Sequence, residues 1–256
     1  MAERARLTAA EIKLARSLVI FEDAEVIAFA KPSGLSSQGG RIAAATLDDL
    51  MAAFAKPSGV KPRLVHRLDR DTSGVILAAK SQPAAAFLGK AMMARRVKKT
   101  YLAIVAPGAP APPAGTIEAA LARQDIGREA YVRIVDPEAT GAQAAFTRYR
   151  TLKADAVAAL TELSPRTGRM HQLRVHLASI GRPIAGDPRY GGALALYGAA
   201  VGRLMLHAAV LAFPHPAGGE RRIEAPTPVD FAALAERIGR WRRGLALSTI
   251  FHKLWT

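Results

Sequence analysis

The sequence predicts an α+β fold, in which a mainly antiparallel mixed sheet is flanked by helices. Segments typical of strands outnumber those typical of helices, and several follow one another with only a turn between them. Strands that succeed each other directly tend to pair antiparallel, whereas a doubly wound fold alternates strands with helices. Hydrophobic residues make up 50% of the 256 residues and charged residues 22%, as expected of a folded chain with a sizeable core.

The chain begins with a predicted short helix and a hairpin. Thr8 and Glu11 have the spacing of a capping box, which predicts a helix over 8–16. Two β-prone runs at 18–21 and 26–30 flank a Glu-Asp turn, and we expect them to pair as a hairpin.

Two further helices are predicted in the first half. A second capping box starts a segment at 46–54 whose apolar residues repeat at helical spacing. A strand with a buried pattern at 75–79 precedes Ser81, which is expected to cap a helix over 82–95.

The second half is expected to be mostly strands. A strand at 101–105 leads into a Pro/Ala/Gly loop at 107–115, which is the best candidate for an internal boundary and which we interpret as a surface loop. The remaining predicted elements are strands near 131–135, 144–152, 157–163 and 204–213, a helix starting near His171, a Gly-rich loop at 181–192, and a helix from Asp230 to about Arg243. We expect one domain over 18–240, preceded by a helical extension over 1–17 and followed by a basic tail over 241–256.

The charge balance points toward a polyanionic partner. Lys and Arg number 36 against 21 acidic residues, which gives a formal net charge of +15 and a pI near 10.7. Nucleic acid is the natural polyanion for such a surface. An arginine-rich proteome with a merely soluble surface explains the charge equally well, so charge alone leaves both interpretations open.

Several chemistries are excluded by composition. There is no cysteine, so disulfides, Cys-ligated zinc, iron–sulfur clusters and thiol nucleophiles cannot occur. Neither a cluster of metal ligands nor a phosphate-binding glycine loop is found, so no metal site is predicted. The N-terminus is charged where a signal peptide is apolar, and no apolar stretch is long enough to cross a bilayer. We expect a cytoplasmic protein, not associated with a membrane and monomeric.

A single carboxylate is the first candidate for a catalytic group. Asp69 stands between Arg67 and Arg70 in the segment 66–74, which turns into the strand at 75–79. A buried carboxylate needs cationic or hydrogen-bonding partners, and one held at such a turn is well placed to face a cleft. An Asp-capped turn with a surface ion pair fits these residues at least as well.

A second polar segment supplies a candidate partner. His171 and Arg174 are three residues apart, so both are expected on one face of a helix. An arginine so placed can bind a carboxylate from another segment through two hydrogen bonds. A helix with a solvated basic face is the alternative.

Taken together, these segments resemble the RluA family of RNA pseudouridine synthases. The stretch 66–74 resembles that family's nucleophile motif, and 31–34 resembles its first motif. The stretch 99–101 is similar to its Lys-x-Tyr element, and 168–176 to its Gly-Arg-x-His-Gln-Leu-Arg motif. Further matches at 186–191 and 206–208 fall in the family's order. Each motif alone is weak, whereas all of them in the right order are highly specific.

The resemblance implies a catalytic domain of the pseudouridine synthase type that isomerises uridines in ribosomal or transfer RNA. It implies that Asp69 is the nucleophile, that Arg174 pairs with it and keeps it ionised, and that Tyr101 packs on the target uracil. Arg67 would occupy the space that the flipped nucleotide leaves. The other residues expected to bind RNA are Lys31, Arg70, Lys99, Arg169 and His171.

The reaction suits a site with one carboxylate. Uracil leaves the sugar as a resonance-stabilised anion, so the second carboxylate of a glycosidase is less necessary. Isomerisation involves no redox change, phosphate transfer or hydrolysis, so no cofactor is expected. The alternative function is a non-catalytic RNA-binding or ribosome-assembly factor on the same fold, which would not need Asp69. A nuclease or glycosidase would lack both a metal cluster and a convincing second carboxylate.

Overall fold

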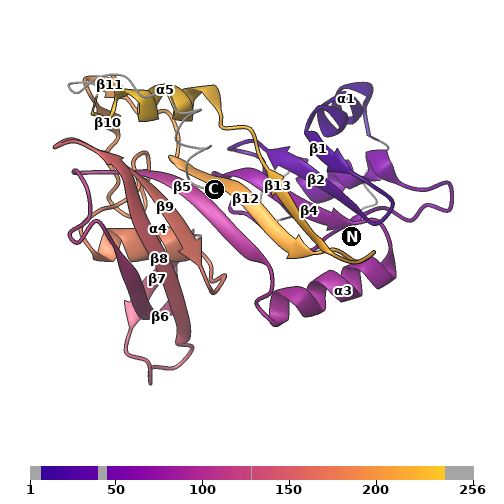
Figure 1. Cartoon of the computed structure of the whole chain (residues 1–256), viewed down its shortest axis with the longest axis horizontal. Coiled ribbons are helices and arrows are strands. Elements are labelled where there is room, and N and C mark those ends of the chain that lie inside the picture. The colour runs from indigo at the N-terminus through magenta and orange to yellow at the C-terminus, as the bar shows by residue number, and fades with distance from the viewer. Residues whose placement is uncertain (1–6, 40–44, 128, 240–256) are drawn as a thin grey trace. The chain divides into compact units, whose positions relative to one another are not determined.

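The computed structural model describes residues 7–39, 45–127 and 129–239 of the chain (Figure 1). Its contacts divide the chain into two compact units. The first unit comprises Met1–Lys99 and Ala208–Pro226, and the second comprises Thr100–His207 and Thr227–Thr256. The predicted α+β class is confirmed. Helices accompany the sheets, and the strand pairs that the structure describes within each unit are antiparallel.

The first unit is a small sheet with helices. Its strands lie in the order β1, β2, β4, β12, with β3 pairing with β4 and β13 with β12. Its elements are α1 (Ala9–Ser17), β1 (Val19–Glu22), β2 (Val26–Lys31), α2 (Leu47–Leu50), the 3₁₀ helix η1 (Met51–Phe54), β3 (Arg63–Leu64), β4 (Ser73–Ala79), α3 (Gln82–Met93), most of β12 (Leu206–Pro214) and β13 (Glu220–Glu224).

Local sequence signals explain most of these elements. The capping boxes at Thr8 and Thr46 and the Ser81 cap of α3 form as predicted. The helix predicted over 46–54 tightens into a 3₁₀ turn after Leu50. Every residue of β4 is buried, as expected of a strand covered on both faces.

The second unit is a longer antiparallel sheet in the order β5, β9, β8, β6, β7. Its elements are β5 (Lys98–Val105, which starts in the first unit), β6 (Ala114–Ile126), β7 (Glu129–Val135), β8 (Gln143–Ala154), β9 (Ala159–Pro165), α4 (Gln172–Ser179), the β10–β11 hairpin (Ala195–Leu196 and Ala199–Ala200) and α5 (Val229–Arg237). Helix α4 covers one face of this sheet, where Val175 packs with Leu121, Val132 and Ala145.

Several elements differ from the prediction, among them the short strands β3, β10 and β11, which were not predicted. Strand β6, with 13 residues, was not predicted, because its Ala and charged residues have weak strand propensity. It is stabilised by pairing with both β7 and β8. Strand β13 was also missed, and α5 ends at Arg237, earlier than predicted, because the backbone turns to an extended conformation at Ile238.

Two other expectations concern the ends of the chain and the membrane. The predicted tail at 241–256 lies outside the described residues. Among the helices that the structure describes, none is long and apolar enough to span a bilayer.

Candidate active site

In the first unit, Asp69 lies in the loop that leads into β4, and the last residue of β2 holds this loop. The ammonium of Lys31 donates hydrogen bonds to the carbonyls of Pro32, Leu35 and Arg70, at 3.0, 2.7 and 2.9 Å. The side chain is 1% exposed. Burial lowers the pKa of Lys31 to about 7, against the opposing charges of Asp71 and Asp69. Lys31 is therefore a buried link between two loops that lie 39 residues apart in sequence.

Small residues after β2 complete this link. The hydroxyl of Ser37 donates to the Leu68 carbonyl at 2.7 Å and accepts from the Leu68 amide at 3.0 Å. The Ser33 hydroxyl donates to the Asp71 carbonyl at 2.8 Å, and the Gly34 amide donates to the Arg70 carbonyl at 2.9 Å. The backbone is thus fixed on both sides of Asp69.

The arginines that flank Asp69 in sequence are not its partners. Arg70 forms an ion pair with Asp71, with 2.9 Å between Nε and Oδ1, and this neighbour raises the pKa of Arg70. Arg67 is exposed and makes no side-chain hydrogen bond or ion pair with another described residue. Both arginines instead present charge at the surface of the loop.

Lys99 and His66 form a second, partly buried feature of the first unit. Burial lowers the pKa of the Lys99 ammonium. Burial, with a contribution from the charge of Lys99, also lowers the pKa of His66 to about 3, and its Nε2 accepts a hydrogen bond from the Leu77 amide at 3.2 Å. His66 is therefore neutral at physiological pH.

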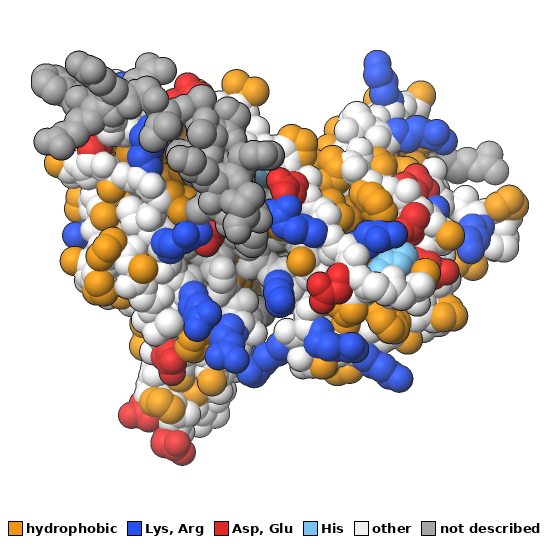
Figure 2. Space-filling model, in the orientation of Figure 1, with side chains coloured by type: hydrophobic (Ala, Val, Ile, Leu, Met, Phe, Trp, Pro, Cys, Tyr) orange, Lys and Arg blue, Asp and Glu red, His pale blue; other side chains and the backbone are white. Residues whose placement is uncertain are grey.

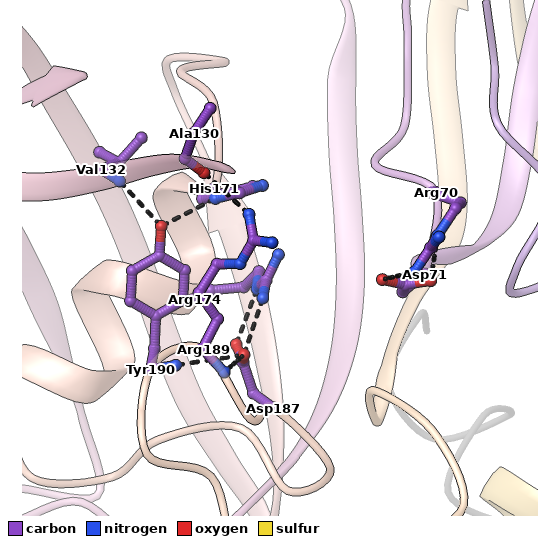
Figure 3. Close-up of polar contacts among 9 residues, drawn as sticks. All are labelled: Arg70, Asp71, Ala130, Val132, His171, Arg174, Asp187, Arg189 and Tyr190. Atoms are coloured by element: carbon purple, nitrogen blue, oxygen red, sulfur yellow. Dashed lines mark hydrogen bonds and ion pairs between the residues drawn. The ribbon is translucent and has the colours of Figure 1, made fainter. Parts of the chain in front are cut away.

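In the second unit, Arg174 of α4 forms a buried ion pair with Asp187 (Figure 3). Its Nε and Nη2 donate to the two carboxylate oxygens of Asp187, each at 2.7 Å. The side chains are 8% and 0% exposed. The same carboxylate accepts from the amides of Arg189 and Tyr190 at 3.0 and 3.3 Å. Arg174 is thereby held in one orientation.

Tyr190 lies against His171 and Arg174 of the α4 segment (Figure 3). The guanidinium of Arg174 stacks over its ring at 4.9 Å from the centroid. Its hydroxyl accepts from the Val132 amide at 2.9 Å and shares a hydrogen bond of 2.8 Å with Nδ1 of His171. His171 precedes the helix in a left-handed conformation, with φ of 52°. The interpretation of α4 as a helix with a solvated basic face is wrong, because Gln172–Leu177 are all buried.

The remaining predicted residues occupy different environments. Arg169 is exposed, and its Nε donates to the Ala144 carbonyl at 3.3 Å. Tyr101 lies in β5 opposite Leu163 and is 9% exposed. Asp69 belongs to the first unit, whereas Tyr101 and Arg174 belong to the second.

Sequence reasoning missed the roles of Asp187, Tyr190 and Gln172. The first two lie in the loop predicted at 181–192, where no spacing rule links them to Arg174. Gln172 is 3% exposed, and its amide nitrogen donates to the Phe146 carbonyl and the Thr147 hydroxyl, both at 3.0 Å. Within the described ranges, no three His, Asp or Glu side chains gather as metal ligands would.

Comparison with known proteins identifies the family of the chain. Residues 25–179 match the family described as RNA pseudouridylate synthase. Over 216 residues the chain is 38% identical to proteins named ribosomal large subunit pseudouridine synthase C in Salmonella typhimurium and Escherichia coli, covering 82% of this chain and 66% of each relative. Over 229 residues it is 34% identical to a Bacillus subtilis protein named uncharacterized RNA pseudouridine synthase YlyB, covering 86% of this chain and 72% of that one. The chain thus spans slightly under two thirds of the length of the first two relatives.

Solved structures show the same similarity. Human RNA pseudouridylate synthase domain containing 4 superposes with a TM-score of 0.71 at 28% identity, covering 89% of this chain and 97% of that one. Human RNA pseudouridylate synthase domain containing 1 gives a TM-score of 0.71 at 26% identity, covering 92% and 93% of the two chains.

Proposed function

The chain belongs to the RNA pseudouridylate synthase family, and we propose that it converts uridines in RNA to pseudouridine with Asp69 as the nucleophile. The observation that carries this assignment is the fixed backbone around Asp69. Five hydrogen bonds with Lys31, Ser33, Gly34 and Ser37 hold the residues on either side of it. A nucleophile that must meet one carbon atom of a bound nucleotide needs such positioning.

The proposed reaction rearranges bonds within the substrate and neither adds nor removes atoms overall. The bond between N1 of uracil and C1′ of the ribose breaks, and a bond between C5 and C1′ forms. A proton leaves C5 and a proton is taken up at N1, so the product is an isomer of the substrate. In this proposal the Asp69 carboxylate attacks C1′ while uracil departs as a stabilised anion, and the bond between Asp69 and C1′ breaks again when C5 joins C1′.

Arg174 is proposed to be the ion partner of Asp69. A guanidinium carries five N–H donors in a rigid fork and can bind carboxylates at more than one edge. The contacts with Asp187 and Tyr190 would fix the plane in which Arg174 presents its charge. A pairing that needs no rearrangement at the moment of reaction would stabilise the charged nucleophile in a site from which water is excluded.

Recognition of the nucleotide is assigned to Tyr101 and Arg67. Tyr101 would pack on the target uracil after the base leaves its stack, which costs a few kcal/mol. Arg67 is exposed in the same loop as Asp69 and would fill the vacated space. Contacts between the basic surface and phosphates would offset the cost of flipping.

The substrate class proposed is large-subunit ribosomal RNA, as in the names of the Salmonella typhimurium and Escherichia coli relatives. Pseudouridine mapping of ribosomal and transfer RNA from a deletion strain and its parent tests this. Loss of a site in large-subunit RNA would support it, and loss only in transfer RNA would contradict it.

The chemical test compares two neighbouring carboxylates. Asp69→Asn should abolish tritium release from C5-labelled uridine in RNA, while RNA binding persists. Asp71→Asn is the matched control, because it makes the same charge change two residues away in an exposed ion pair. The control should keep most of the activity. Full activity of the Asp69 variant would contradict the proposal, and a chain inactive in every form would favour a non-catalytic RNA-binding role.

A further inference from the structure

A second basic feature lies outside the site described above. Between Thr72 and Ile117 the sequence contains six Lys or Arg residues and no Asp or Glu. Four of them form what we call the α3–β5 basic turn: Lys90, Arg95, Arg96 and Lys98. All four are exposed, and none forms a side-chain hydrogen bond or ion pair with another residue that the structure describes. Lys and Arg side chains gather along the lower edge of the first unit, where α3 is drawn (Figures 1 and 2).

The backbone of this turn places an arginine where glycine is favoured. Helix α3 ends in a Schellman motif, in which the Arg96 amide donates to the Ala91 carbonyl at 2.9 Å and the Arg95 amide to the Met92 carbonyl at 3.0 Å. Arg95 therefore adopts a left-handed conformation, with φ of 55°. A residue with a Cβ is strained there, so this arginine reduces the stability of the fold relative to glycine.

The helix dipole explains only part of this arrangement. Cations near a helix C-terminus interact favourably with the exposed carbonyls, which accounts for Lys90 in the last turn of α3. The helix dipole does not require an arginine at the left-handed position that Arg95 occupies. It also does not explain Met93, which is 80% exposed among the four cations. Charge and apolar surface together suit a partner that is polyanionic and also offers sugar and base surfaces.

We propose that the α3–β5 basic turn binds the phosphate backbone of the RNA substrate, next to the nucleotide that reacts. This inference rests on RNA being the substrate, as proposed above. Lys98 and Tyr101 are three residues apart in one strand, so their Cα atoms are at most about 11 Å apart. Their side chains lie on opposite faces of the strand, so phosphates held by the turn would lie within a few nucleotides of the uridine assigned to Tyr101, not around it.

The test measures how a fluorescently labelled RNA stem–loop binds to the full chain at several salt concentrations. The variant Arg95→Glu/Arg96→Glu removes two proposed phosphate contacts. Each contact contributes about 0.9 to the slope of log K against log salt, so the slope should fall by about 2. At about 0.1 M salt, binding should weaken by at least about tenfold.

The matched control is Lys13→Glu/Arg16→Glu on α1. It makes the same charge change at two exposed residues of the same unit, and Arg16 also lies in the last turn of its helix. The control should weaken binding much less. Equal loss in both variants would overturn the proposal, because it would mean that only net charge matters. No loss in the Arg95→Glu/Arg96→Glu variant would also overturn it.

A single variant separates binding from folding. Arg95→Gly should raise the melting temperature, because glycine relieves the left-handed strain, and should lower the salt slope by about 1. Unchanged RNA binding in this more stable variant would remove Arg95 from the interface and overturn the proposal.

Turnover separates this inference from the proposed function. The basic-turn variants should raise the RNA concentration needed for half-maximal rate and leave tritium release at saturating RNA unchanged. If the wild-type chain releases no tritium but the variants still lose RNA binding, the proposed reaction fails and the docking surface stands. If turnover is intact and binding is unaffected, the docking surface alone fails.

Discussion

Arg174 donates two hydrogen bonds of 2.7 Å to Asp187, and the pair is almost completely buried. The guanidinium also stacks on Tyr190, whose backbone amide binds the same carboxylate. Breaking a buried ion pair by removing one partner leaves an uncompensated charge in a dry environment. Asp187 therefore fixes the residue on which we propose that the nucleophile depends.

We expect Asp187→Asn to be destabilising and to impair turnover. Loss of one partner of a buried pair lowers the free energy of unfolding by about 3 to 5 kcal/mol. Urea denaturation measures this change. Turnover should fall more than RNA affinity, because the variant disturbs the orientation of Arg174.

Asp230→Asn is the matched control for this prediction. Asp230 binds Arg203 through the same pair of guanidinium nitrogens, but its side chain is 52% exposed. An exposed pair contributes about 1 kcal/mol or less. Equal destabilisation by the two variants would show that burial of the Arg174–Asp187 pair has no special consequence.

Lys31 should make the stability of the protein depend on pH in the alkaline range. Its pKa in the folded state is lowered from 10.5 to about 7. Below about 7 both the folded and unfolded states are charged, and the folded state bears the cost of burying the ammonium. As pH rises toward 10.5, the folded state releases its proton while the unfolded state keeps it.

Wild-type stability should therefore increase relative to Lys31→Met between pH 7 and 10.5. Urea unfolding at a series of pH values measures the difference between the two proteins. If wild-type stability stays constant or falls relative to that of Lys31→Met over this range, the prediction is refuted.

His176 should contribute to unfolding in acid. The residue is 0% exposed, its Nδ1 shares a hydrogen bond of 2.9 Å with the Thr147 hydroxyl, and burial lowers its pKa from 6.5 to about 4. Between these values the unfolded state binds a proton that the folded state does not, so stability falls as pH falls. His176→Gln removes this contribution and should lose less stability than the wild type from pH 6.5 to about 4. If thermal melts show that the two proteins lose the same stability over this pH range, the prediction is contradicted.

Gly74 should not tolerate a side chain. Gly74 lies at the start of β4 and has a φ of +124°. A Cβ at this position would overlap the backbone of Ala208, which belongs to the same unit. Gly74→Ala should therefore lower the free energy of unfolding by about 2 to 6 kcal/mol, through strain and overpacking. Gly89 lies inside α3 with open space around it, and Gly89→Ala should raise stability by about 0.5 to 1 kcal/mol. Chemical denaturation of both variants checks the contrast in sign.

Features set by neighbours in the chain were predicted well. The capping boxes at Thr8 and Thr46 join residues three positions apart, so spacing alone reveals them. The same holds for Ser81, which caps α3. Strand β6 was missed because its stability comes from two partner strands rather than from its own residue types.

The sequence by itself determined the α+β class, most elements, and the polar segments that carry the family's motifs. Only the tertiary structure decided which distant groups meet. Lys31 reaches a carbonyl 39 residues away, and Arg174 takes Asp187 as a partner that no spacing rule indicates. Local hydrogen bonds and hydrophobic periodicity depend on residues that are close together in the sequence. The pairing of buried charges depends instead on which surfaces the fold removes from water together.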